Sequence, residues 1–161
     1  MDGGGVIAID GPSASGKSST AAAVARTLGV PHIDSGALYR GLALVALESA
    51  AAAGITAAAV PAGEVLAAAE RRHLELRLEQ GSFSVHLDGA DAERRIRTPE
   101  VTGAVSPVSA LPALREWVNA RLRRAAAEAG GAVVDGRDIG TVVFPGRSEE
   151  RRGGKECSSR W

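Results

Sequence analysis

The sequence contains one cysteine, few aromatic residues and no long apolar run. Cys157 has no second cysteine to pair with, which excludes an internal disulfide. Aromatic residues make up 3% of the chain, so a hydrophobic core must be built from Ala, Val, Leu and Ile. No stretch approaches the roughly 18 apolar residues of a membrane span, and the N-terminus lacks the basic segment of a signal peptide. We therefore expect a cytoplasmic protein.

The chain also has no excess of positive or negative charge, because 19 basic residues balance 19 acidic ones and the formal net charge is zero. Such a chain has no broad attraction for nucleic acid or for membrane surfaces, and we expect neither as a partner. Any anion site must come from a local cluster. A length of 161 residues with 45% hydrophobic content suits one domain, which we expect to be a monomer.

The most informative segment present is residues 11–18, Gly-Pro-Ser-Ala-Ser-Gly-Lys-Ser, which matches the phosphate-loop pattern G-x-x-x-x-G-K-[S/T]. An apolar run, 6–9, precedes it and an Ala-rich helical segment, 20–28, follows it, as the pattern requires. Glycines let backbone N–H groups surround a phosphate chain. Lys17 would reach the β- and γ-phosphates, and the Ser18 hydroxyl would bind Mg²⁺. The alternative is a glycine-rich loop without a ligand.

Short apolar strands alternate with helices along the rest of the chain, which is typical of a parallel sheet buried on both faces. Apolar and polar residues alternate through 74–79 and again through 83–88, which predicts a β-hairpin with one buried face. We interpret this hairpin as a small insertion that covers one side. The other expected elements are strands at 30–33 and 132–134 and helices at 37–53, 61–72, 98–110 and 112–129.

Residues 34–40, Asp-Ser-Gly-Ala-Leu-Tyr-Arg, follow the second predicted strand. Ligands of open α/β sheets collect at such strand ends. Ser35 could therefore hydrogen-bond a base or a sugar, and Arg40 could hold a phosphate. The alternatives are a helix N-cap for Ser35 and a surface charge for Arg40.

Residues 135–138, Asp-Gly-Arg-Asp, follow the third apolar strand. Asp135 suits a role in the Mg²⁺ shell. Arg137 offers a cation for phosphate, and Asp138 offers an acceptor for the amino group of a base. The alternative is a tight turn with solvated charges, but dense charge directly after a buried strand favours function.

The guanidinium group suits bidentate phosphate binding. Among the arginines near the hairpin, Arg97 and Arg115 each lie at a predicted helix start and are the candidates. The run Arg121, Arg123 and Arg124 is interpreted as a solvated helix face. His32, His73 and His86 lack metal-like spacing and are interpreted as structural.

Residues 147–161 contain no Ala, Leu or Val and are rich in charge. One interpretation is a solvated charged tail. We favour a non-native segment, because it resembles translated sequencing-adaptor read-through, and we predict that it is disordered. The domain is then 1–146, with an insertion at about 60–112.

Four segments resemble the bacterial cytidylate kinases (CMP kinases), a branch of the nucleoside monophosphate kinases. They are Ile-Asp-Gly-Pro-Ser at 9–13, the 34–40 segment, Ile-Arg-Thr-Pro-Glu-Val at 96–101, and Asp-Gly-Arg-Asp-Ile-Gly-Thr-Val-Val-Phe-Pro at 135–145. The resemblance implies the α/β P-loop kinase fold, in which helices flank a parallel sheet and a small hairpin insertion binds the monophosphate. It also implies ATP-dependent, Mg²⁺-dependent phosphorylation of CMP and dCMP in pyrimidine nucleotide metabolism.

The resemblance also assigns residues. ATP would be bound by Gly11, Pro12, Ser13, Ala14, Ser15, Gly16, Lys17, Ser18 and Ser19. CMP would be bound by Ser35, Arg40, Ser106, Arg115, Arg137 and Asp138, with Ser106 and Asp138 at the cytosine ring. Lys17 and Arg137 would be catalytic, and Ser18 and Asp135 would hold Mg²⁺.

The family pattern continues beyond residue 145 with a further strand, an arginine-bearing lid, and a last strand and helix, none of which follows here. This departure predicts that strand 6–9 lies at a sheet edge and that the chain is an incomplete copy with little activity. The alternatives are a P-loop kinase for another small molecule and a nucleotide-binding fragment without activity. A GTPase-type switch is disfavoured, because the sequence lacks Asn-Lys-x-Asp.

Overall fold

The computed structural model describes residues 5–145 and 150–152. Its elements confirm the predicted order of strands and helices. The strands are β1 (Val6–Asp10), β2 (His32–Asp34), β3 (Glu75–Glu79), β4 (Ser82–Leu87), β5 (Ala90–Asp91), β6 (Ala132–Gly136) and β7 (Glu150–Arg152). The α-helices are α1 (Lys17–Leu28), α2 (Ser35–Ala53), α3 (Ala62–Arg71), α4 (Pro99–Ser109) and α5 (Pro112–Glu128). Short helical turns are η1 (Ala57–Ala59), η2 (Arg95–Arg97) and the π-helical η3 (Ile139–Val143).

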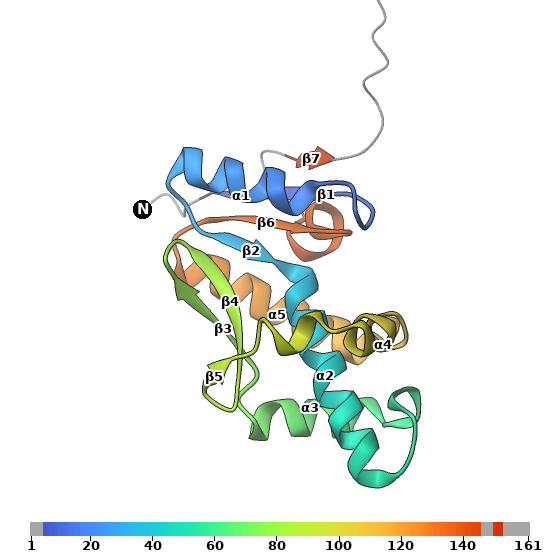
Figure 1. The fold of residues 1–161 in the computed structure, drawn as a ribbon. Coiled ribbons are helices and arrows are strands. Elements are labelled where there is room, and N and C mark those ends of the chain that lie inside the picture. The colour runs from blue at the N-terminus through green and yellow to red at the C-terminus, as the bar shows by residue number, and fades with distance from the viewer. Residues whose placement is uncertain (1–4, 146–149, 153–161) are drawn as a thin grey trace, which may run out of the picture.

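A mostly parallel sheet forms the centre of the fold, in the order β3-β4-β2-β6-β1-β7, with β5 paired to β4 (Figure 1). Strands β2, β6, β1 and β7 run parallel. Asp135 of β6 lies opposite Ile9 of β1 on one side and opposite Asp34 of β2 on the other. The carboxyl ends of three strands therefore meet at one edge, where open α/β sheets bind their ligands.

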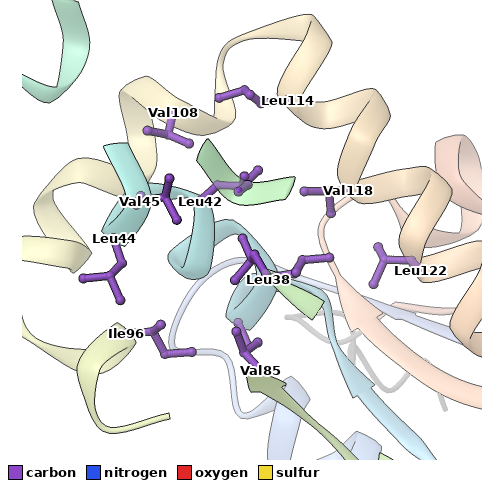
Figure 2. Packing of buried hydrophobic residues seen from close by; sticks show 14 of the residues in the cluster. Leu38, Leu42, Leu44, Val45, Val85, Ile96, Val108, Leu114, Val118 and Leu122 are labelled. Atoms are coloured by element: carbon purple, nitrogen blue, oxygen red, sulfur yellow. The ribbon is translucent and has the colours of Figure 1, made fainter. Parts of the chain in front are cut away.

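Helices cover both faces of the central strands, as the sequence predicts. On one face, Ala21 and Ala25 of α1 pack against Ile9 and Val133. On the other, Leu38 and its neighbours on α2 pack against α4 and α5, as Figure 2 shows. All five residues of β6 are buried, which is typical of a parallel strand enclosed by two helical layers.

Small and branched aliphatic side chains fill the larger core. The labelled residues of Figure 2 come from α2, β4, η2, α4 and α5, and all are aliphatic. Gly41 of α2 allows a close approach: a Cβ atom there would lie 2.8 Å from Leu74 Cδ1 and 3.3 Å from Val85 Cγ1. The low aromatic content therefore goes with a core of closely packed aliphatic residues.

The hairpin differs from the prediction that it covers one side. Strand β4 is parallel to β2, with His32 opposite Ser82, and β3 is antiparallel to β4. The His32 N–H donates to the Gly81 carbonyl at 3.3 Å. The hairpin thus extends the sheet sideways, because the outer edge of β2 offers unpaired backbone groups that a neighbouring strand satisfies.

The edge position predicted for β1 is also not found among the described residues. Strand β7 pairs parallel to β1, with Ala8 opposite Glu150 and Asp10 opposite Arg152. An apolar strand with free N–H and C=O groups favours pairing with any extended segment nearby. The three residues of β7 belong to the predicted tail, whose other positions, 147–149 and 153–161, lie outside the described residues.

Within residues 5–145 and 150–152, no helix has both the length and the apolar character that crossing a membrane requires.

Candidate functional site

The phosphate loop has the backbone geometry that its pattern predicts. Ala14 and Gly16 adopt left-handed conformations with φ of +60° and +80°, and α1 begins at the next residue, Lys17. Lys17 Nζ donates to the Pro12 carbonyl at 3.1 Å. In the described structure, no side chain caps α1 and no acidic residue lies in its first turn. The positive end of the helix is therefore open to an anion.

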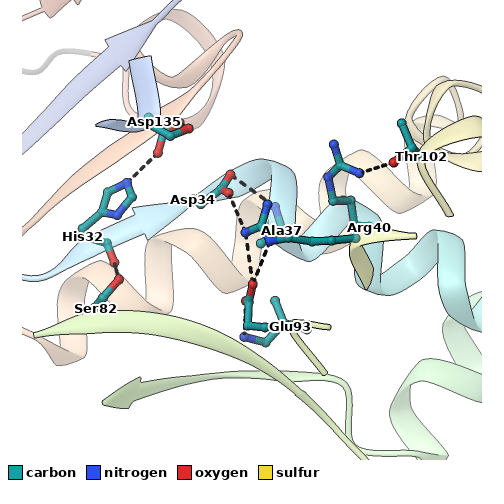
Figure 3. A network of polar contacts seen from close by, with 11 residues as sticks. His32, Asp34, Ala37, Arg40, Ser82, Glu93, Thr102 and Asp135 are labelled. Carbon is teal, nitrogen blue, oxygen red and sulfur yellow. Dashed lines mark hydrogen bonds and ion pairs between the residues drawn. The ribbon is translucent and has the colours of Figure 1, made fainter. Parts of the chain in front are cut away.

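Asp135 lies directly behind this loop. Its side chain is 1% exposed, and both carboxylate oxygens are hydrogen-bonded. Ser18 Oγ donates to Oδ2 at 2.7 Å, and the His32 ring contacts Oδ1 through Nε2 at 2.6 Å (Figure 3). The link from the loop to the end of β6 joins the two residues that the sequence assigns to the metal.

The oxygen donors of Ser18 and Asp135 fit Mg²⁺, which prefers hydroxyl, carboxylate and phosphate oxygens. Across the described ranges, no three His, Cys, Asp or Glu side chains form a group that could hold a metal ion. A magnesium ion at this site would therefore need phosphate oxygens and water to complete its shell, as is usual for Mg²⁺ in nucleotide sites.

A cavity of about 470 Å³ adjoins the loop. It lies between the carboxyl edge of the sheet and the helices α2, α4 and α5. The predicted site residues in its wall are Ser13, Ala14, Lys17, Ser18, Ser35, Arg40, Arg97, Ser106, Arg115, Arg137 and Asp138. Gly11, Pro12, Ser15, Gly16, Ser19 and Asp135 are not part of the wall. One cavity thus joins the predicted ATP residues to the predicted CMP residues.

The arginines of the cavity have polar partners on other elements. Arg137 Nη2 donates to Ser13 Oγ, within the phosphate loop, at 2.6 Å. Arg115 Nη2 donates to Asp138 Oδ2 at 2.8 Å. Each guanidinium is part-exposed, so an incoming phosphate can compete for its remaining donors.

Another arginine of the cavity wall, Arg40, donates from Nη1 to Thr102 Oγ1 at 2.7 Å (Figure 3). Thr102 belongs to α4, and Arg40 belongs to α2. The bond therefore fixes an arginine of the cavity wall between two helices.

Asp34, not Ser35, caps helix α2. Its carboxylate accepts from the Ala37 N–H at 3.3 Å and lies 3.5 Å from Arg97. Burial raises the pKa of Asp34, the negative charge of Asp135 adds to the rise, and Arg97 opposes it. This capping role, which the sequence offered as the alternative for Ser35, leaves the Ser35 hydroxyl in the cavity wall.

Gly136 is required where β6 meets the start of α2. A Cβ atom there would lie 2.4 Å from Ser35 Oγ and 2.7 Å from two carbons of Ile139. The glycine of the 135–138 segment thus brings that segment against Ser35, and any larger residue would push the two apart.

Sequence reasoning missed several cavity residues and one supporting residue. Asp10, 6% exposed, accepts from the N–H groups of Ile139 at 2.7 Å and Gly140 at 2.9 Å. Asn119 lines the cavity one helical turn after Arg115. An acidic residue that closes an apolar strand and an amide at i+4 from a candidate arginine are signals that the sequence contains.

Tyr39 also lines the cavity without having been predicted. Burial raises the pKa of its phenol; the nearby charge of Arg115 lowers it and that of Asp138 raises it. The hydroxyl therefore stays protonated at neutral pH and is available as a donor to a ligand.

The predicted solvated helix face of Arg121, Arg123 and Arg124 is confirmed in part: Arg123 and Arg124 are exposed, whereas Arg121 is half-buried. Arg121 stacks on Trp117, with its guanidinium carbon 3.4 Å from the ring centroid, and pairs with Glu70. Arg123 Nε donates to the Val143 carbonyl at 2.7 Å. Both guanidinium groups contact neighbouring elements, which a helical charge pattern alone does not reveal.

A family model described as cytidylate kinase matches residues 7–148. The cytidylate kinase of Pelotomaculum thermopropionicum is 45% identical over 139 residues, which cover 86% of this chain and 59% of that protein. That of Thermus thermophilus is 44% identical over 143 residues, covering 88% and 64%, and that of an Enterobacter species is 46% identical over 142 residues, covering 87% and 59%. The chain spans about three fifths of the length of these curated relatives. On this similarity, the chain belongs to the cytidylate kinase family.

Proposed function

We propose that this chain binds ATP at the phosphate loop and CMP or dCMP in the adjoining cavity, and that it transfers the γ-phosphoryl group to the monophosphate at a low rate. The observation that carries the proposal is the shared cavity, which Lys17 lines together with Arg137 and Asp138. The relatives are named cytidylate kinases, and their name supports the choice of nucleotide.

The cationic side chains of the cavity would bind the phosphate groups of the two nucleotides. Lys17 and Arg137 would stabilise the negative charge on the transferred group. Arg40 would hold the monophosphate. Because the acceptor is itself a phosphate dianion, the reaction needs no general base, and catalysis consists of positioning and electrostatic stabilisation.

The cytosine ring would lie near Asp138, with Ser106 as a second contact. A carboxylate accepts a hydrogen bond from the cytosine amino group, whereas uracil presents a carbonyl oxygen at that position. The 2.8 Å bond from Arg115 holds the Asp138 carboxylate in place. Selectivity for cytosine over uracil would thus follow from one oriented acceptor.

Ser18 and Asp135 would hold Mg²⁺ beside the ATP phosphates. The ion supplies positive charge that offsets the charge of the phosphate chain. Membership of the relatives' family supports a place in pyrimidine nucleotide metabolism, and we propose a cytoplasmic monomer. The zero net charge of the protein gives no broad attraction for nucleic acid or membranes, so we propose neither as a partner.

A coupled assay of ADP formation from Mg-ATP, with CMP, dCMP, UMP and AMP as acceptors, tests the proposal. We expect CMP and dCMP to be the preferred acceptors. Preference for another acceptor would favour a different small-molecule P-loop kinase. Binding of ATP and CMP without turnover would favour the alternative of a nucleotide-binding fragment without activity.

A further inference from the structure

Three side chains from three elements form a continuous chain of hydrogen bonds beneath the phosphate loop. Ser18 of α1 donates to one oxygen of Asp135 at 2.7 Å. The other oxygen of Asp135, at the end of β6, lies 2.6 Å from His32 Nε2 on β2. Figure 3 shows the His32 ring directed at the carboxylate from the neighbouring strand. In its Nε2–H tautomer the ring donates this bond.

The backbone of His32 is fixed by two hydrogen bonds to the hairpin. The backbone N–H of His32 donates to the Gly81 carbonyl at 3.3 Å, and the backbone carbonyl of His32 accepts from Ser82 Oγ at 3.5 Å. The His32 side chain is 13% exposed and that of Asp135 is 1% exposed. A carboxylate removed from water needs hydrogen-bond donors, and in the described structure its side-chain donors are Ser18 and His32.

Without His32, one oxygen of Asp135 would lose its partner, and the carboxylate could rotate away from Ser18. The bond to His32 therefore selects the orientation in which Oδ2 faces the loop. The ring acts through another residue, because it does not line the cavity. This is how a donor behind a metal-binding carboxylate commonly acts, with losses of about 10- to 100-fold in affinity when it is removed.

We infer that His32 is a positioning residue, which orients Asp135 so that the carboxylate and Ser18 can share a magnesium ion brought by ATP. This assigns a role in nucleotide binding to a histidine whose spacing along the chain suggests a purely structural one. The inference rests on the ATP-binding part of the proposed function and does not depend on the choice of CMP.

The test measures the affinity of a fluorescent ATP analogue with saturating Mg²⁺ and with EDTA, for the unaltered chain and for variants. The ratio of the two affinities reports the contribution of Mg²⁺, which a merely structural role would leave unchanged. The variants are His32→Phe, which has no donor, His32→Asn, whose amide nitrogen is too short to reach Asp135, and His32→Gln, whose amide nitrogen reaches about as far as Nε2. His73→Gln, at an exposed site, is the control.

We expect His32→Phe and His32→Asn to reduce the Mg²⁺ enhancement about tenfold, with affinity in EDTA unchanged. His32→Gln should retain most of the enhancement, and His73→Gln all of it. Using two variants that lose the bond to Asp135 keeps the test valid if one of them does not fold, which thermal melting would show.

Three results would overturn the inference: an unchanged enhancement in His32→Phe or His32→Asn, an equal loss of affinity with and without Mg²⁺, or no rescue by His32→Gln. If the unaltered chain binds no ATP analogue, the inference falls together with the ATP site. Normal Mg²⁺-dependent binding without CMP phosphorylation would contradict only the proposed CMP kinase activity.

Discussion

Two buried carboxylates lie at the carboxyl ends of the neighbouring strands β1 and β6, and each holds a segment that lines the cavity. Asp10 accepts two backbone N–H bonds at the start of η3, the segment that follows Asp138. Asp135 binds Ser18 at the start of α1 and the ring of His32. Charge-assisted bonds of this kind are stronger than neutral ones. Adjacent strand ends thus fix the segment that follows Asp138 and the phosphate loop relative to each other.

Lys17→Ala should weaken Mg-ATP binding about tenfold or more, because the ammonium group is the cation of the loop that would reach the β- and γ-phosphates. The free energy of unfolding should change by less than about 0.5 kcal/mol, because the amine makes a single hydrogen bond, to the Pro12 carbonyl, in the described structure. Calorimetric titration and chemical denaturation measure the two effects.

Arg26→Ala is the matched control for Lys17→Ala. Arg26 is an exposed cation in the last turn of the same helix, away from the loop. ATP affinity that falls equally in both variants would show a general charge effect and would remove Lys17 from the proposed site.

Asp34→Asn should raise the free energy of unfolding at neutral pH. Burial and the charge of Asp135 raise the pKa of Asp34 in the folded state, so the folded state binds its proton more tightly than the unfolded state does. Stability from this group is present below the unfolded pKa and is lost as the pH rises through the folded pKa. Asparagine removes the charge and keeps the N-cap.

The check on Asp34 is chemical denaturation of both proteins at several pH values. The advantage of Asp34→Asn should be largest at neutral pH and should shrink as the pH falls into the ordinary titration range of aspartate. A constant difference between the two proteins at all pH values would contradict the raised pKa.

At the scale of the elements, helix α5 holds the π-helical turn η3 through a single arginine. Arg123 Nε donates to the Val143 carbonyl at 2.7 Å, and its Nη2 donates to the Val142 carbonyl at 3.1 Å. The last carbonyls of a helix have no partners within it, so the guanidinium group satisfies two of them. η3 lies directly after Asp138, and this contact helps to fix one wall of the cavity.

Arg123→Leu should lower the free energy of unfolding by about 1–3 kcal/mol, because two carbonyls lose a charged donor. Amide hydrogen exchange should speed up in η3 before it changes in the rest of the molecule. Arg124→Leu, an exposed neighbour on the same helix, is the control and should leave η3 protected. Equal effects of the two substitutions would mean that the Arg123 contact does not hold η3.

The elements that could be predicted are those with local signals. The phosphate loop is specified by its own glycines and Lys17. The helices and strands are indicated by the composition and spacing of apolar residues along the sequence. The pairing of β4 with β2 could not be predicted, because it depends on which sheet edge is free. The turn η3 was also missed, since its support comes from Asp10, 129 residues away.

The same limit applies to the site. Many of the charged and hydroxyl residues that line the cavity followed from motifs, but the residues that position them did not. His32 contacts Asp135 across 103 residues of sequence, and its neighbours along the chain give no sign of that partner. The capping of α2 by Asp34 instead of Ser35 depends on one residue of difference in where the helix begins, a boundary that sequence patterns place poorly.

At the scale of the whole molecule, the sheet brings distant segments to one cavity. Its wall takes residues from the loop before α1, the start of α2, helices α4 and α5, and the segment after β6. Because every segment comes from a different part of the chain, binding at this cavity is coupled to folding as a whole. A ligand present at a hundred times its dissociation constant should add about 2.7 kcal/mol to the free energy of unfolding.

The most direct test of the account is a calorimetric titration of the chain with CMP and with UMP, repeated with Asp138→Ala. We predict that CMP binds at least about tenfold more tightly than UMP, because the oriented Asp138 carboxylate would accept a hydrogen bond from the cytosine amino group. The ratio should approach one in Asp138→Ala, with ATP affinity unchanged. Equal binding of CMP and UMP, or a preference for CMP that survives the substitution, would contradict the central claim.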